Sequence, residues 1–244
     1  MRIALLASLL AGLATGFGGA LIALFPKLSR GLYDTLLGFS AGVMLAAGSI
    51  TLLGPALRQN GVGSIAAGLL CGALLVFLLE RLVPHLEPHF APELTGPGKR
   101  LGLLMAAALT IHHVPEGLAV GVSFAGPAPQ LGIIVASAVA LQNIPEGLAV
   151  AMPLRAAGFS RPRAILWAAS SGMAQPLAAA LGVWLVALVG PMVPFALAVA
   201  AGAMIFVASD QLIPESRQQP AKKAPSLGLI AGFLLVAVLT KLCT

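Results

Sequence analysis

The sequence is poor in charged, aromatic and cysteine residues. Only 9% of its 244 residues are Asp, Glu, Lys or Arg, whereas soluble domains have about a quarter. Aromatic residues make up 5% and cysteine occurs twice, with Cys71 inside an apolar run and Cys243 next to last. A disulfide framework and a cysteine-based metal motif are therefore both excluded. A phosphate-binding glycine loop and an HExxH motif are also absent, so nothing points to ATP use or a metalloprotease site.

Apolar residues dominate what is present. They make up 59% of the chain, and the mean hydropathy is +0.99, which indicates an integral membrane protein. The 28 glycines and 18 prolines are scattered among Leu, Ala and Val, a pattern typical of close-packed and locally broken transmembrane helices. We expect one all-α transmembrane domain covering residues 1–244.

Breaks at charged, proline and glycine clusters divide the chain into eight apolar segments. Each has the roughly 20 residues that a helix needs to cross a bilayer. The predicted helices are residues 2–25, 32–54, 62–84, 101–125, 130–153, 163–188, 192–214 and 226–243, with a cytoplasmic loop at about 85–100.

The basic residues predict the orientation. With eight crossings both termini share one face, which has Arg2, Arg58 and Lys241, while the other eleven Lys and Arg residues fall on the opposite face. By the positive-inside rule, that opposite face is cytoplasmic and both termini are outside the cell (inner) membrane. Because the basic residues are not gathered in one patch, we expect the lipid bilayer and no nucleic acid as a partner. Asp34 falls at a cytoplasmic helix end, where we expect water to reach it.

Two segments share a motif that puts acidic groups in the middle of a membrane. Residues 110–120 read TIHHVPEGLAV and residues 141–150 read LQNIPEGLAV. His112 precedes Glu116 by four positions, as Gln142 precedes Glu146, so each pair shares a helix face. The proline before each glutamate removes a backbone N–H and is expected to loosen the helix beside these groups.

These residue types favour a divalent transition metal. Two ionised glutamates balance one divalent cation, and imidazole nitrogen with carboxylate oxygen suits borderline metals rather than Mg²⁺ or Ca²⁺. The alternatives are interhelical hydrogen bonding that only packs the bundle, and a proton relay through His and Glu. A metal-dependent intramembrane hydrolase is the alternative enzyme, and a structural or receptor-like bundle is a third class.

Internal repetition extends beyond the PEG segments. AGVMLAAGS at residues 41–49 is similar to AGAMIFVAS at residues 201–209. These lie in the second and seventh predicted helices, which run in opposite directions. Inverted repeats of this kind are typical of secondary transporters whose binding site lies near the midplane.

The pair HHVPEG and QNIPEG, in a chain of eight predicted helices, resembles the ZIP family of zinc and iron permeases. The resemblance covers essentially the whole chain. It implies that the protein is not an enzyme, and that Zn²⁺, or Cd²⁺, Fe²⁺ or Mn²⁺, is carried into the cytoplasm as a substrate rather than held as a cofactor. It also implies that helices one, four, five and six move against helices two, three, seven and eight, and that the protein forms a homodimer.

The resemblance implies two neighbouring metal positions. The primary position would use Met44, His112, Glu116, Gln142 and Glu146, and the secondary position would use His113, Asn143 and Gln175, with the glutamates shared. Many relatives carry Glu-Pro where this chain has Gln175 and Pro176. With one carboxylate fewer, a second divalent ion would bring unbalanced charge into a medium of low dielectric constant. We therefore predict one tightly bound metal and a weak or absent second one.

A candidate exit path lies on the cytoplasmic side. The chain reads SDQLIPES around Asp210 and Gln211, where many relatives have a His-Glu pair. Asp210 has an equally simple reading as a capping or snorkelling carboxylate. His85 and His89 alternate with Glu87 in the predicted loop and are candidates for transient metal capture, although such a segment is commonly just solvated.

Overall fold

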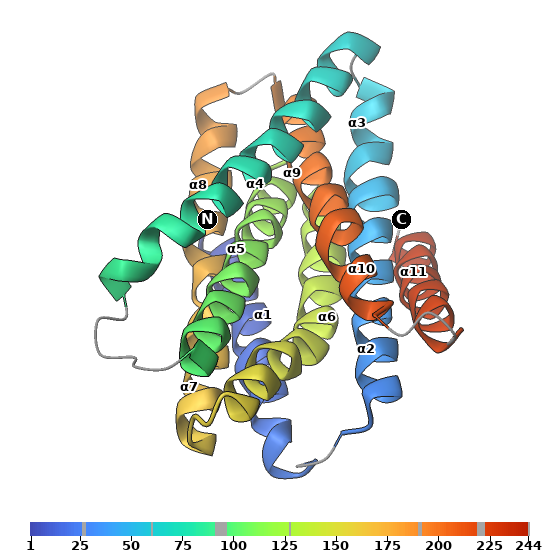
Figure 1. Ribbon diagram of the computed structural model, residues 1–244. Coiled ribbons are helices and arrows are strands. Elements are labelled where there is room, and N and C mark those ends of the chain that lie inside the picture. Colours follow the sequence, from blue (N-terminus) through green and yellow to red (C-terminus); the bar gives the residue numbers. More distant parts are fainter. Residues whose placement is uncertain are drawn as a thin grey trace.

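The computed structural model is helical throughout its regular elements (Figure 1). It describes residues 1–25, 28–59, 61–90, 97–126, 128–189, 192–218 and 223–243; the side chains of 82–90, 97–106, 108, 109, 129 and 189 lie outside this description. The α-helices are α1 Arg2–Ala20, α2 Arg30–Ala46, α3 Gly54–Gln59, α4 Val62–Phe90, α5 Pro97–Ala125, α6 Pro129–Ala156, α7 Arg161–Gly172, α8 Ala174–Val189, α9 Val193–Val207, α10 Ile213–Ser216 and α11 Ala224–Cys243. A 3₁₀ turn, η1 Leu21–Ala23, follows α1, and two π-helices, η2 Ala47–Leu53 and η4 Ala208–Leu212, follow α2 and α9.

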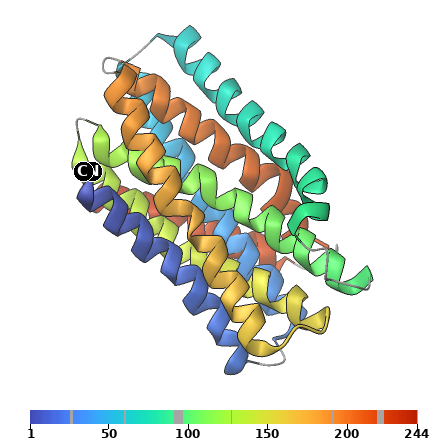
Figure 2. The same cartoon turned by 90° about the vertical axis from the view of Figure 1, so that its left-hand side faces the viewer.

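These elements form a membrane-spanning bundle, which confirms the all-helical fold class. Seven helices or helix series in the described residues are long and apolar enough to cross a membrane. The eighth long helix is α5, with 29 residues. Helix α6 is mostly buried, whereas α4 and α11 are mostly exposed. Figures 1 and 2 accordingly show α5 and α6 running through the interior of the bundle. An exposed apolar helix surface is stable here because lipid, not water, surrounds it.

Both termini lie at the same end of the bundle. Figure 1 shows them at the same height, and Figure 2 shows them superposed at the left-hand end. An even number of crossings requires this arrangement. The start of α2 and the end of α10 lie at the opposite end, which we call the inner end; the end with the termini is the outer end.

Part of the loop predicted at residues 85–100 is helical in the structure. Helix α4 continues to Phe90 and α5 begins at Pro97, and residues 91–96 lie outside the described residues. The prediction placed a break at this cluster of prolines and charged residues, but near a membrane surface water can satisfy the carbonyl groups that a proline leaves unpaired. His85 and His89 therefore fall within α4, although their side chains lie outside the description.

Three predicted helices contain breaks in regular α-helix that were not predicted. The second and seventh crossings pass through the π-helices η2 and η4, each followed by a proline at 55 or 214. The sixth crossing is interrupted at Met173, between α7 and α8. Here Pro176 lacks the N–H that would bond the carbonyl of Gly172. π-Helical turns are frequent at functional sites.

Glycines bring the helices into backbone contact in two separate groups. In the first group, Gly147 of α6 lies against the carbonyl of Thr15 in α1, and Gly117 of α5 lies against that of Gln175 in α8. In the second group, glycines join α2 to α11 and α4 to α9. At these positions a Cβ atom would lie within 3 Å of the neighbouring backbone, so only glycine allows the approach. The first group contains both PEG helices.

Each group contains helices from both halves of an inverted repeat. Residues 68–79, GLLCGALLVFLL, match residues 228–239, GLIAGFLLVAVL, so residue n of the first three crossings corresponds to residue n + 160 of the last three, whereas the two central crossings are related by a shift of 30. The contacts follow the same shift, since Gly68 lies against the carbonyl of Phe195 as Gly228 lies against that of Thr35.

A contact between equivalent residues marks the symmetry axis. A Cβ on Gly12 would meet the carbonyl of Gly172, and a Cβ on Gly172 would meet that of Gly12. A reciprocal contact of this kind arises where a twofold axis passes between two copies. The pseudo-twofold axis therefore passes between α1 and α7.

The glycine contacts predict a large effect of a single substitution. In Gly72→Val, the new side chain would begin 2.7 Å from the amide nitrogen of Ala203, and overpacking of this kind costs about 1–3 kcal/mol. We expect a lower thermal unfolding temperature in detergent. Gly63→Val, on the same helix, is the matched control, because a Cβ atom at Gly63 would have no neighbouring atom within 4 Å. Equal unfolding temperatures for the two variants would contradict the packing described above.

Candidate metal site

The two PEG segments lie in the middle of α5 and α6. Pro115 and Pro145 both fall inside helices that continue through them, so the expected loosening does not interrupt the secondary structure. Apolar residues on both sides keep these helices within the membrane. The polar side chains of the motifs are nevertheless buried in protein and do not face lipid. Their burial makes every unsatisfied polar atom costly.

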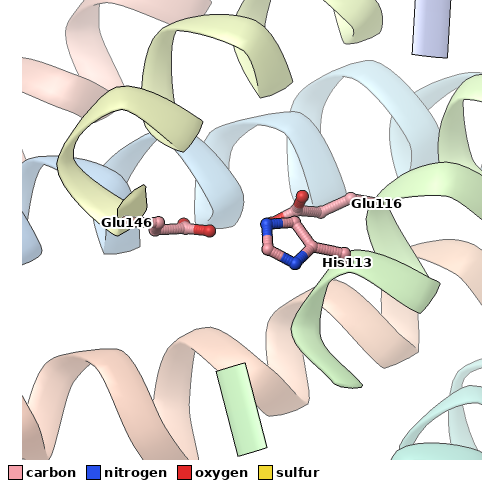
Figure 3. A group of neighbouring side chains, drawn as sticks. All are labelled: His113, Glu116 and Glu146. Atoms are coloured by element: carbon pink, nitrogen blue, oxygen red, sulfur yellow. The ribbon is translucent and has the colours of Figure 1, made fainter. Parts of the chain in front are cut away.

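Three ionisable side chains come together between these helices. His113 and Glu116 of α5 and Glu146 of α6 are buried, and each offers a ligand atom within 4.8 Å of the other two. Figure 3 shows the His113 ring beside the Glu116 carboxylate, with Glu146 extending toward them from the facing helix. The two glutamates thus meet as the duplicated motif predicts.

The imidazole grouped with the carboxylates is His113 rather than His112. The family resemblance assigns His112 to the primary position and His113 to the secondary position, with the glutamates shared. Residues three and four apart are both neighbours on a helix, so spacing cannot decide between the two histidines. His113 is the histidine that the structure groups with Glu116 and Glu146.

Side-chain amides hold Glu116 in place. Gln142 donates a hydrogen bond from Nε2 to Oε1 of Glu116 at 2.8 Å, and Gln175 donates from Nε2 to Oε2. Asn143 donates from Nδ2 to the carbonyl of Ala11 in α1 at 2.7 Å. Gln142, Asn143 and Gln175, which the sequence analysis assigned to the two metal positions, therefore surround the site.

Several acceptor atoms of this cluster have no donor among the described residues. Apart from the neighbouring Glu116 carboxylate, neither oxygen of Glu146 has a hydrogen-bond partner there. The same is true of the amide oxygens of Gln142, Asn143 and Gln175. Buried acceptors without donors are rare because each forfeits its solvation. An oxygen-rich cluster of this composition can instead be satisfied by a cation.

His112 lines a cavity that leads toward the inner end. This cavity has a volume of about 410 Å³ and is lined by His112, Asp210 and Gln211, together with Glu215 and Gln218. The candidate exit residues Asp210 and Gln211 therefore share a cavity with a predicted metal ligand. Both belong to the π-helix η4, which turns them toward this space.

Asp34, in the first turns of α2, differs from expectation. We expected water to reach this carboxylate, but it is fully buried. Arg30, four residues earlier on α2, pairs with it at 2.9 Å and also donates to Oε1 of Gln218 at 2.7 Å. A basic partner one helical turn away makes the burial tolerable.

Met44 occupies the α2 side of the bundle and is fully buried. One turn earlier on the same helix, Ser40 donates a hydrogen bond to the carbonyl of Gln142 at 3.0 Å. Because residues four apart share a helix face, Met44 faces the α6 side, one turn closer to the outer end. A thioether there would add a soft ligand.

A second cavity, of about 390 Å³, lies at the outer end and is lined by Gln59, Ser123 and Gln130 among others. Ser123 stands two helical turns beyond Glu116 on α5. The intervening residues 118, 119, 120 and 122 are buried and apolar. The outer cavity is therefore separated from the carboxylates by packed side chains.

Two residues at the site, Thr15 and Ser40, were not predicted from the sequence. The Thr15 hydroxyl lies 3.2 Å from Nε2 of His113, and both Thr15 and Ser40 are fully buried. The repeat offers a signal that could have found Thr15, because its counterpart 160 positions later is Gln175.

Known proteins resemble this chain over nearly its full length. The sequence profile of the ZIP zinc transporter family matches residues 95–240. Zinc transporter GufA of Myxococcus xanthus is 41% identical over 98% of both chains. Zinc transporter ZIPB of Bordetella bronchiseptica is 40% identical, over 94% of this chain and 78% of that protein. Human zinc transporter ZIP11 is 33% identical, over 91% of this chain and 92% of that protein. The resemblance read from the PEG segments is confirmed: this chain belongs to the ZIP family of zinc transporters.

Proposed function

We propose that this protein takes up zinc and releases it into the cytoplasm, with Glu116 and Glu146 as the central ligands. The single observation that carries this assignment is the buried pair of carboxylates from two facing helices, joined by His113. Zinc is the substrate rather than a resident cofactor. Members of this family are transporters, and nothing supports the alternative of an intramembrane hydrolase.

The negative charge of the proposed ligands balances one divalent ion. Glu116 and Glu146 supply two negative charges, whereas Gln142, Asn143 and Gln175 supply only neutral oxygens. A second divalent ion would leave two positive charges unbalanced in a dry site, which is unfavourable. We propose that zinc binds to Glu116, Glu146 and His113, with oxygen from Gln142, and that His112 and Met44 complete the site from the inner and outer sides.

The proposed path from the site leads past His112 to Asp210 and Gln211. The cavity that these residues line supports this path. Asp210 would attract a cation leaving the carboxylate pair, and water in the cavity would rehydrate it. His85 and His89 stay candidates for capturing zinc beyond this point.

We propose alternating access rather than an open channel. Two observations support this: packed apolar residues separate the outer cavity from the carboxylates, and glycine contacts join the helices into two groups. The group formed by α1 and α5 to α8 carries the carboxylates, and the group formed by α2, α4, α9 and α11 would act as the scaffold. Movement of one packed group against another is the usual way in which such repeats expose a midplane site to each side.

We propose that the protein lies in the cell (inner) membrane with both termini outside and functions as a homodimer. The orientation is supported by the excess of Lys and Arg in the loops opposite the termini. In this orientation, the inner end of the bundle, toward which the Asp210 cavity leads, faces the cytoplasm. The dimer is an expectation from the family resemblance alone.

Removing either central carboxylate should abolish uptake. In liposomes containing Glu116→Ala or Glu146→Ala protein, we expect zinc uptake to fall at least about 100-fold, because the remaining carboxylate cannot balance a divalent ion. Glu116→Gln and Glu146→Gln preserve the side-chain volume and serve as controls for packing. Unfolding temperatures in detergent should confirm that all four variants fold. Uptake near the wild-type rate in either alanine variant would refute the assignment.

Changing Gln175 to glutamate should create a second metal position. This substitution adds a third carboxylate next to Glu116, so Gln175→Glu protein should bind two zinc ions where the wild type binds one. Metal analysis of purified protein, together with calorimetric titration, measures the ratio. Gln175→Ala removes the amide donor without adding charge and should keep a ratio of one. Two full-occupancy zinc ions in the wild type would contradict the charge argument.

Cys243 offers a direct test of orientation, because its side chain is exposed at the end of α11. In a Cys71→Ala background, a membrane-impermeant maleimide added to intact cells should label Cys243. Protein with both cysteines replaced should not be labelled. Labelling that requires cell lysis would place the termini in the cytoplasm and reverse the proposed direction of transport.

A further inference from the structure

Helix α1 forms a third wall of the site beside the two PEG helices. Ala11 and Thr15 are one turn apart on α1. The carbonyl of Ala11 accepts the hydrogen bond of Asn143, and the Thr15 hydroxyl lies 3.2 Å from Nε2 of His113. Gly147 of α6 packs against the Thr15 carbonyl. One turn of α1 thus contacts residues from both motifs.

The Thr15 hydroxyl contacts another helix rather than its own. Six serine and threonine hydroxyls donate back to a carbonyl three or four residues earlier: Ser8, Thr35, Ser49, Ser170, Ser171 and Ser216. This arrangement is the ordinary one for hydroxyls inside apolar helices. Thr15 instead reaches across to a histidine on another helix, although it is fully buried. Packing alone does not require this contact.

His113 depends on this contact for its orientation. The ring is fully buried, and Nδ1 has no hydrogen-bond partner among the described residues. The hydroxyl of Thr15 therefore supplies the ring's one hydrogen bond described here, at Nε2. Since a hydroxyl can either donate or accept, this contact restrains the rotation of the imidazole without selecting its tautomer. Partners of this kind behind a metal-binding histidine commonly change metal affinity by about 10–100-fold when they are removed.

We propose that Thr15 is a positioning residue for zinc binding, which acts by holding His113 in the orientation that faces Glu116 and Glu146. This inference rests on the proposed function, in which His113 is a zinc ligand. The repeat supports it, because the counterpart of Thr15 is Gln175, which bonds the carboxylate of Glu116. Equivalent positions of the two halves thus each hold one side chain of the same cluster.

The test removes the hydroxyl with little change in volume. In liposomes, Thr15→Val should raise KM for zinc about 10–100-fold and leave the maximal rate within about twofold. Thr15→Ser keeps the hydroxyl and should restore a KM near that of the wild type. Thr51→Val is the matched control, because Thr51 is also buried and bonds Thr240 of another helix at 3.1 Å, away from the cluster. If Thr15→Val does not fold, Thr15→Ala takes its place.

A double-mutant cycle decides whether Thr15 acts through His113. In a His113→Ala background, Thr15→Val should cause no further rise in KM, because the side chain that it positions is gone. An equal rise in both backgrounds, or a wild-type KM in Thr15→Val, would overturn the inference and leave the proposed function standing. Wild-type protein that carries no zinc would overturn the proposed function itself.

Discussion

Glu116 and Glu146 meet inside a membrane protein, where each uncompensated charge costs several kcal/mol. Their placement constrains much of the surrounding structure. Two amide side chains bond Glu116, whereas the oxygens of Glu146 have no donor among the described residues. A cluster with more buried acceptors than donors is unfavourable by itself. It becomes favourable when a cation supplies the missing positive charge, and this links the architecture of the bundle to transport.

The glycines matter because they let helices approach closely enough to form this cluster. The carboxylates come from α5 and α6, while α1 and α8 contribute Thr15 and Gln175 at the positions where Gly147 and Gly117 remove side-chain bulk. Each glycine follows directly after a motif glutamate. The PEG motif therefore combines three features in three residues: a proline without an N–H, a buried carboxylate and a close helix contact.

The fold class was predicted correctly and the two motif glutamates were singled out, because both depend on features visible along the chain. Apolar length determines the number of crossings, and the duplicated motif places Glu116 and Glu146 at corresponding depths. The histidine beside them could not be chosen, because His112 and His113 are both neighbours of Glu116 on an ideal helix. The π-helices η2 and η4 were missed for a related reason, since periodicity does not reveal a single extra residue in a turn. Thr15 was missed because a lone threonine in an apolar helix usually bonds its own helix.

Departures from the internal symmetry suggest how a nearly symmetric bundle acquires a direction. At the inner end, Asp210 corresponds to Ile50, and Asp34 corresponds to Pro194. The carboxylates near the inner cavity thus have apolar or neutral counterparts in the other repeat. In the centre, His112 and His113 correspond to Gln142 and Asn143. A zinc ion leaving the central pair would therefore find an imidazole and then a carboxylate on the inner side, but apolar packing on the outer side. Under the proposed function, this uneven distribution of polar groups on a symmetric frame would favour release toward the inner end.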